Sequence, residues 1–133
     1  RFRVVGQLAS PERLLTVVIA DGLDDDRRLL GRALGRSGRF RVVGEAADGG
    51  AAVKLARRWR PDIVVLDLDM PGMDGLEALG HIHSALPGSR VVLLSGHASE
   101  PVIERALAGG ATAFFKKGAP DVVGQLLKTM EGT

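Results

Sequence analysis

Residues 63–75, which read Ile-Val-Val-Leu-Asp-Leu-Asp-Met-Pro-Gly-Met-Asp-Gly, decide the fold that we expect for this chain. The apolar run at 63–66 is rich in β-branched residues and too short for a helix, so it predicts a strand. Pro71 and Gly72 then interrupt regular structure, which puts Asp67 at the carboxyl end of that strand, where a loop begins. In open parallel sheets, ligands bind at this end of the strands. Asp67 is therefore the first candidate for chemistry.

Predicted strands and helices alternate along the chain. Apolar runs bounded by turn residues predict strands at residues 15–20, 40–43, 63–66, 91–94 and 112–115. Apolar residues at helical spacing predict helices around residues 29–34, 53–59, 76–86, 102–107 and 122–127. Because the connections are short, the alternation implies an α/β fold in which helices cover both faces of a parallel sheet. Polar residues near the helix starts are the expected caps: Asp25 or Asp26, Asp48, Asp74 and Ser99.

The composition excludes several classes of protein. A chain of 133 residues with 45% hydrophobic residues can bury one core, so we expect a single domain. It contains no cysteine, which rules out disulfides, thiolate metal ligands and a thiol nucleophile. No apolar stretch approaches the roughly 20 residues that span a bilayer, and the first residues lack the apolar core of a signal peptide. We therefore expect a soluble, cytoplasmic protein without membrane contact.

The charge pattern argues against nucleic-acid binding by this chain. The net charge is only +2, and the arginines are scattered rather than gathered in a tract. They fall mostly on expected helix exteriors, without aromatic residues on which bases could stack. A solvated surface is the favoured interpretation.

One segment of the chain occurs twice. Residues 1–6, Arg-Phe-Arg-Val-Val-Gly, are repeated unchanged at residues 39–44, in the second predicted strand. The repeat is either a duplicated strand or an artefact of how the chain begins. We hypothesise an extra strand in an amino-terminal extension, residues 1–14, that pairs with an exposed sheet edge. The main domain is then expected at residues 15–133.

Polar residues follow the carboxyl ends of four different predicted strands: Asp21, Asp67, Ser95 and Lys117. A parallel sheet brings all of them to one edge. Two adjacent carboxylates favour a hard divalent cation, for which Mg²⁺ is the first candidate. A lysine ammonium and a serine hydroxyl beside that cation suit the charged oxygens of a phosphoryl group. The sequence therefore predicts a site for phosphoryl transfer.

These residues, together with the string at 67–75, resemble the receiver domains of two-component response regulators over nearly all of residues 15–130. The resemblance implies a flavodoxin-like, doubly wound fold of five parallel strands in the order 2-1-3-4-5. It also implies that Asp67 accepts a phosphoryl group from a histidine kinase. Ser95 and Lys117 match the family's residues that bind the phosphoryl oxygens.

Other residues acquire expectations from the same resemblance. Phe114 matches the family's aromatic switch residue, whose ring moves inward on phosphorylation and repacks the face of the fourth helix and fifth strand. Its neighbour Phe115 is expected in the core. His97 lies where family members tend to adjust how quickly the phosphoryl group is lost. The remaining residues have ordinary expected roles, in which Trp59 packs and His81 and His83 lie on the surface.

The chain departs from the family pattern at Gly22. Family members usually end the first strand with two adjacent acids, whereas this chain has Asp21 followed by Gly22. The aspartates at 24–26 come soon afterwards, but we expect them to serve the cap and dipole of a helix leading away. Asp69 is the preferred replacement, so the expected Mg²⁺ ligands are Asp21, Asp67 and Asp69. Loss of one acid is expected to weaken Mg²⁺ binding.

Three functions are open at this point. The leading one is a phosphoacceptor receiver, which is a switch rather than an enzyme. The first alternative keeps the fold but makes the domain a phosphorylation-independent interaction module, because Gly22 replaces a metal-binding acid. The second is a phosphatase of the haloacid-dehalogenase type, which the pair Asp67 and Asp69 resembles. We disfavour it, because the pair follows the third strand rather than the first and little chain remains after it.

The resemblance also implies partners. A sensor histidine kinase is the expected phosphoryl donor. Family members often pair through the face of the fourth helix, fifth strand and fifth helix, so a homodimer is an expectation. The segment 117–120, Lys-Gly-Ala-Pro, resembles receivers that precede a helix-turn-helix DNA-binding output domain, which implies transcription regulation. The sequence does not decide between a removed output domain and a single-domain regulator.

Overall fold

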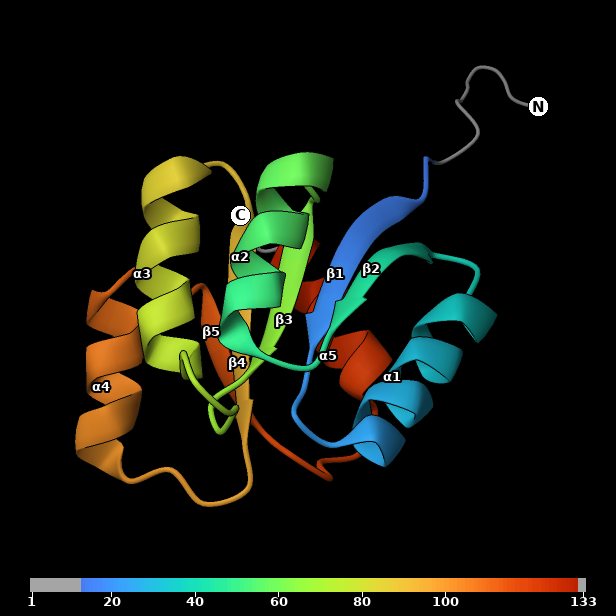
Figure 1. The fold of residues 1–133 in the computed structure, drawn as a ribbon. Coiled ribbons are helices and arrows are strands. Elements are labelled where there is room, and N and C mark those ends of the chain that lie inside the picture. Colours follow the sequence, from blue (N-terminus) through green and yellow to red (C-terminus); the bar gives the residue numbers. More distant parts are fainter. Residues whose placement is uncertain (1–12, 132–133) are drawn as a thin grey trace.

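The computed structural model describes residues 13–131, in which strands and helices alternate strictly (Figure 1). The elements are β1 (Leu15–Ala20), α1 (Asp24–Arg36), β2 (Phe40–Ala46), α2 (Gly49–Trp59), β3 (Ile63–Asp67), α3 (Gly75–Ala85), β4 (Arg90–Ser95), α4 (Glu100–Ala108), β5 (Ala113–Lys116) and α5 (Val122–Glu131). Within these residues the strands form a five-stranded parallel sheet in the order β2-β1-β3-β4-β5, which confirms the expected flavodoxin-like topology. The hypothesised amino-terminal strand, at residues 1–6, lies outside the described residues.

The core has two layers because successive side chains of a strand point to opposite faces of the sheet. Val64 in β3 belongs to a hydrophobic cluster with residues of α2, α3 and α4. The next residue, Val65, belongs to a second cluster that includes Leu34 of α1 and Leu126 of α5. Figure 1 shows α2 and α3 in front of the sheet and α5 behind it. Burying each of these aliphatic side chains contributes about 1.5–3 kcal/mol to the stability of the fold. Because both faces of the sheet are packed in this way, the sheet is a firm support for the residues at its carboxyl edge.

Strand β2 is longer than the sequence predicted. The expected strand ended at residue 43, because the glycine that follows indicates a turn. Instead, the pairing of β2 with β1 shifts register after Val42, which is opposite Val17, and resumes with Gly44 opposite Val18. Val43 is thus the extra residue of a β-bulge. Gly44 therefore lies within the strand and does not end it.

The helix caps agree with the sequence only in part. Asp48 and Asp74 each accept a hydrogen bond from a backbone N–H in the first turn of α2 and α3, as expected. Ser99 occupies the N-cap of α4, but its side chain makes no cap hydrogen bond. The expected cap at Asp25 or Asp26 is wrong, because both residues lie inside the first turn of α1. Their carboxylates pair with basic side chains instead, Asp25 with Arg28 and Asp26 with Lys117.

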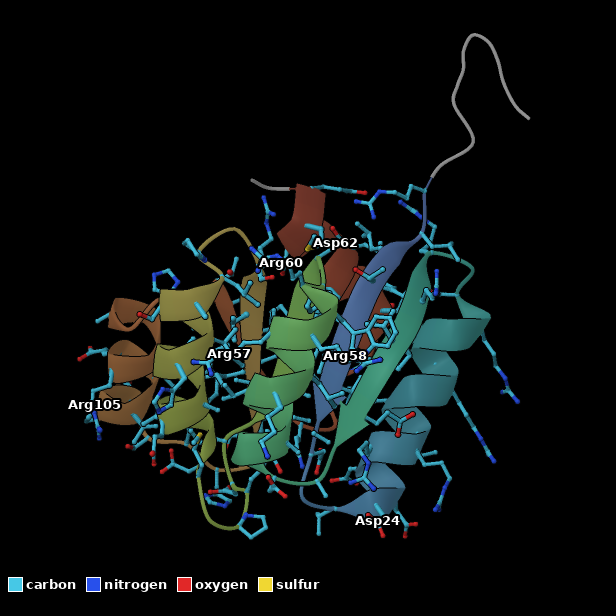
Figure 2. The ribbon with its side chains drawn as sticks, turned by 45° about the horizontal axis from the view of Figure 1, so that its top comes forward. Asp24, Arg57, Arg58, Arg60, Asp62 and Arg105 are labelled. Atoms are coloured by element: carbon cyan, nitrogen blue, oxygen red, sulfur yellow. The ribbon has the colours of Figure 1, made fainter. Side chains whose placement is uncertain are left out.

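A cluster at Asp62 ties the amino ends of β1 and β3 together. Figure 2 shows Asp62 and Asp24 at opposite ends of the molecule. The carboxylate of Asp62 accepts hydrogen bonds from the backbone N–H of Thr16 at 2.8 Å and from its hydroxyl at 3.1 Å. Arg13 pairs with the same carboxylate at 3.1 Å. These contacts fix the strand register at the end of the sheet opposite the candidate site.

Two surface expectations have different outcomes. Trp59 does not pack as expected: it is 44% exposed at the end of α2, and the guanidinium of Arg58 lies 5.2 Å from its ring centroid (Figure 2 labels Arg58). Trp59 lies on nearly the same helix face as the buried Ala52, seven residues earlier, but it is the last residue of α2, before the chain turns at Arg60, and the end of the helix leaves its ring exposed. His81 and His83 are exposed, as expected. None of the helices within residues 13–131 has the length and apolar character that a bilayer crossing requires.

Candidate functional site

Four polar residues reach the carboxyl edge of the sheet from four different strands. Asp21 follows β1, Asp67 ends β3, Ser95 ends β4 and Lys117 follows β5. Only 3% of Asp21, 3% of Asp67 and 1% of Ser95 is exposed to solvent. Buried polar groups persist only when they are hydrogen-bonded or paired, so their partners define the site.

The ammonium of Lys117 lies at the centre of an acidic cluster. Its Nζ atom is 2.9 Å from Asp21 Oδ2, 3.0 Å from Asp26 Oδ2 and 3.3 Å from Asp67 Oδ2. Its backbone N–H donates to the Ser95 carbonyl at 2.8 Å, which fixes the start of the side chain. Burial acts to lower the pKa of Lys117, but the hydrogen bonds to Asp21 and Asp26 and the charge of Asp67 raise that pKa well above the ordinary lysine value. The ammonium is therefore charged at physiological pH.

The carboxylate of Asp67 is oriented by backbone donors on both sides. Oδ1 accepts the N–H of Asp69 at 3.2 Å, and Oδ2 accepts the N–H of Gly22 at 3.5 Å, beside the Lys117 ammonium. Burial, followed by the charge of Asp21, raises the pKa of Asp67 above its ordinary value of 3.8, although Lys117 acts in the opposite direction. A buried carboxylate in this setting gains from any added cation.

Close packing at the start of α3 explains why the string at 67–75 ends in a glycine, Gly75. A Cβ atom at Gly75 would lie 2.6 Å from the carbonyl oxygen of Asp67 and 2.8 Å from Cα of Leu68. The backbone N–H of Gly75 also donates to the Leu68 carbonyl at 2.9 Å. The start of α3 thus packs directly on the backbone of Asp67, and only a glycine permits this approach.

Asp69 does not direct its carboxylate to Asp67. Its Oδ2 atom lies 3.2 Å from Nε2 of His97, and both side chains are largely exposed. Sequence reasoning named Asp69 as a metal ligand and His97 as a modulator of phosphoryl loss, but it did not connect them. In the described part of the chain the two residues form a bridge between the β3–α3 and β4–α4 loops, next to the cluster around Lys117.

The side chains of Ser95 and Phe114 have partners outside the acidic cluster. The hydroxyl of Ser95 accepts the backbone N–H of His97 at 3.2 Å, so it is occupied by its own turn. Phe114 is partly buried against the cluster that includes α2, α3 and α4. Phe115 packs on the other face of the sheet and is also only partly buried, against the expectation of a core residue.

Asp26 is the site residue that sequence reasoning missed. It lies in the first turn of α1, where we expected an acid to act on the helix dipole, yet its carboxylate reaches Lys117. The signal that could have found it is positional: α1 begins only three residues after Asp21, so its first turn remains beside the sheet edge. A cap role was the simpler interpretation, because sequence spacing does not say which way a first-turn side chain points.

Comparison with known proteins identifies the class of this fold and site. A model of the response regulator receiver domain matches residues 17–128. A protein of Mycobacterium tuberculosis named as a transcriptional regulatory protein, NarL, is 40% identical over 107 residues, which are 80% of this chain and 49% of that protein. The solved signal receiver domain of NarL superposes with a TM-score of 0.86 at 37% identity, covering 92% of this chain and all of that domain.

Two further relatives widen the comparison. A protein-glutamate methylesterase/protein-glutamine glutaminase of Anaeromyxobacter dehalogenans is 36% identical over 110 residues, 83% of this chain and 32% of that enzyme. A response regulator of Burkholderia pseudomallei, solved with a phosphorylated aspartic acid, calcium ion and citrate, has a TM-score of 0.78 at 25% identity, covering 87% of this chain and 66% of that one. The chain thus spans about half or less of the length of the two curated relatives, NarL and the methylesterase.

The chain belongs to the response-regulator receiver family, and the expected fold and family are confirmed. Its relatives include both a named transcription regulator and an enzyme, so the shared part is the receiver and not the output.

Proposed function

We propose that this receiver domain accepts a phosphoryl group on Asp67 from the phosphohistidine of a sensor histidine kinase. The observation that carries the proposal is the convergence of Asp67, Asp21 and Lys117 at the carboxyl edge of the sheet, in a chain of the receiver family. The proposed role of the domain is that of a switch in a signalling pathway, in which the phosphoryl group on Asp67 is the signal.

The proposed reaction moves one phosphoryl group between two residues. An oxygen of Asp67 attacks phosphorus, so that a P–O bond forms while the P–N bond to the donor imidazole breaks. The imidazole leaves with the bonding electron pair and takes a proton from water. We assign the attack to Oδ2, which lies 3.3 Å from the Lys117 ammonium and accepts the longer backbone hydrogen bond, 3.5 Å from Gly22, whereas Oδ1 accepts the N–H of Asp69 at 3.2 Å. The ammonium then stabilises charge on the phosphoryl oxygens.

Mg²⁺ fits the donor chemistry of this edge. Asp21 and Asp67 offer buried carboxylate oxygens, the ligands that Mg²⁺ prefers, and burial, followed by the charge of Asp21, raises the pKa of Asp67. When bound, the ion would neutralise the acids and the transferring phosphoryl group. Residues 13–131 hold no group of three histidine or carboxylate side chains arranged for one ion. We therefore propose that Asp69 contributes its backbone carbonyl, while its carboxylate stays with His97.

The Burkholderia response regulator supports this proposal by analogy. That protein was solved with a phosphorylated aspartic acid and a calcium ion. Its receiver fold is the one described for this chain. A phosphorylated aspartate and a hard divalent cation therefore occur together in a relative of this domain.

The proposed output is a change of the surface formed by α4, β5 and α5. Phosphorylation would draw the Ser95 hydroxyl from its turn toward the phosphoryl oxygens, and Phe114 would follow. We propose that this surface mediates homodimerisation and, by analogy with the relative named as a transcriptional regulator, controls a DNA-binding output domain. A phosphohistidine donor of this kind would meet the domain in the cytoplasm.

Intact mass tests the proposal. The protein is incubated with phosphoramidate and MgCl2, and the expected product carries one added phosphoryl group. Asp67→Asn is the matched control and is expected to gain none. A wild-type protein that gains no phosphoryl group from phosphoramidate or a phosphorylated kinase would overturn the proposal. The comparisons give no support to the alternative of a phosphorylation-independent module, nor does any contact favour the phosphatase.

A further inference from the structure

Lys117 is shared by three carboxylates, but only two of them are buried. Asp21 and Asp67 are buried at the carboxyl edge of the sheet, whereas the side chain of Asp26, on α1, is 42% exposed. A single ammonium therefore stands between two acids that are candidate cation ligands and one acid that is not. This asymmetry suggests distinct roles for the acids.

Gly22 does not supply the acid that family members usually have there. A Cβ atom at Gly22 would lie 3.3 Å from the Asp69 carbonyl oxygen and 3.4 Å from Pro71 Cδ, so position 22 faces the β3–α3 loop. Asp26 reaches the cluster from α1, through Lys117. Asp26 therefore restores the number of acids around the site, but it does so on the lysine rather than at position 22.

A divalent cation and the Lys117 ammonium compete for the same oxygens. Both need the carboxylates of Asp21 and Asp67, and two cations crowded on the same carboxylates repel each other. If the ammonium had no other anionic partner nearby, displacing it would leave a half-buried charge unpaired, which is unfavourable. Asp26 removes this difficulty because it already lies 3.0 Å from Nζ.

We propose that Asp26 is a positioning residue that retains the Lys117 ammonium when a divalent cation takes the carboxylates of Asp21 and Asp67. In this way it compensates for Gly22, since cation binding does not have to break the last ion pair of the lysine. The inference rests on the proposed function, because it concerns the cation of the same site. It assigns Asp26 no contact with the cation or the phosphoryl group.

Calorimetric titration with MgCl2, without any phosphoryl donor, tests the inference. Asp26→Asn is expected to lower Mg²⁺ affinity about tenfold, the equivalent of one lost charge-assisted contact. Asp25→Asn is the matched control, because it removes the same charge from the same helix turn, and Asp25 pairs only at the surface with Arg28. It is expected to change the affinity less than about twofold. Asp26→Glu, which keeps the charge, is expected to recover most of the affinity.

A double-mutant cycle separates positioning from direct action. In a Lys117→Met background, Asp26→Asn is expected to have no effect on Mg²⁺ affinity beyond that of Asp25→Asn, because the group through which it acts is gone. Thermal melts check that each variant is folded. Equal effects of Asp26→Asn and Asp25→Asn in the wild-type background would overturn the inference, as would an effect of Asp26→Asn that survives in Lys117→Met.

The inference and the proposed function fail in different ways. A protein that accepts no phosphoryl group, but whose Mg²⁺ affinity depends on Asp26 through Lys117, contradicts the function and leaves the inference intact. A protein that is phosphorylated on Asp67 while Asp26→Asn leaves Mg²⁺ affinity unchanged contradicts the inference alone. Absence of measurable Mg²⁺ binding to the wild-type protein also contradicts the inference.

Discussion

The Nζ atom of Lys117 lies 3.3 Å from Oδ2 of Asp67, and this contact joins the ends of β5 and β3 across the intervening β4. The two residues come from strands that do not pair with each other, so the contact depends on the register of both with β4. A phosphoryl group on Asp67 would enter this contact. The resting ion pair is therefore the structure that phosphorylation must rearrange.

Asp67→Asn is expected to stabilise the protein at neutral pH. The pKa of Asp67 is raised in the folded state, so the folded protein binds more protons than the unfolded chain between pH 3.8 and that raised value. Stability contributed by Asp67 is therefore lost as pH rises through this window. We expect a gain on the order of 1 kcal/mol in the free energy of unfolding at pH 7, because the variant removes a charge that burial and Asp21 disfavour. Urea denaturation measures it.

The pH dependence gives the contradicting result for this variant. Well below pH 3.8 the carboxyl group is protonated in both states, so wild type and Asp67→Asn are expected to converge. A variant that is less stable than wild type at pH 7 would show that the ion pair with Lys117 outweighs the burial of the charge.

Gly75→Ala is expected to destabilise the protein, because its Cβ would collide with the Asp67 carbonyl at the start of α3. Overpacking of this kind lowers the free energy of unfolding by about 1–3 kcal/mol. Gly80→Ala is the control on the same helix, since a Cβ there meets nothing within 4 Å. It is expected to be neutral or to stabilise by about 0.5–1 kcal/mol. Equal stability of the two variants would contradict the close approach of α3 to Asp67.

Asp62→Ala is expected to lower stability at neutral pH. Burial acts to raise the pKa of Asp62, but hydrogen bonds from Arg13 and Thr16 hold that pKa below its ordinary value of 3.8. Its stabilising contribution is thus complete above pH 3.8 and is lost as pH falls through the lowered pKa. Loss of the carboxylate leaves the N–H of Thr16 without its partner, which costs about 1–3 kcal/mol.

The control for Asp62→Ala is Asp25→Ala, at a carboxylate that is 90% exposed. Surface changes of this type alter stability by less than about 0.5 kcal/mol. The difference between Asp62→Ala and wild type in thermal melts should narrow at low pH, because the charge of Asp62 is lost while its carbonyl oxygen can still accept the N–H of Thr16. A difference that stays constant down to pH 2 would mean that the Asp62 charge is not involved.

The strand order, the family and the four strand-end residues could be predicted from the sequence, because hydrophobic periodicity and the string at 67–75 are local signals. The directions in which the site's side chains point could not be predicted from the sequence. Asp26 and Asp69 are both acids close to the site in sequence, and the sequence favoured Asp69 as the one that joins it. In the structure Asp26 reaches Lys117, and Asp69 turns to His97. Which neighbour a first-turn or loop carboxylate meets depends on tertiary packing.

The length of β2 and the exposure of Trp59 were missed for a related reason. A glycine can end a strand or sit beside a bulge, and only pairing with β1 decides between these outcomes. Likewise, Trp59 shares a helix face with the buried Ala52, and its exposure follows from its place at the very end of α2, which the apolar pattern does not reveal.

The central claim is that Asp67 is the residue that carries the phosphoryl group. The most direct measurement is to treat the protein with phosphoramidate and MgCl2, reduce the acyl phosphate with borohydride, and map the resulting homoserine by peptide mass spectrometry. The account predicts homoserine at position 67 alone. Homoserine at position 21, 26 or 69, or at no position in a protein that is shown to be folded, would contradict it.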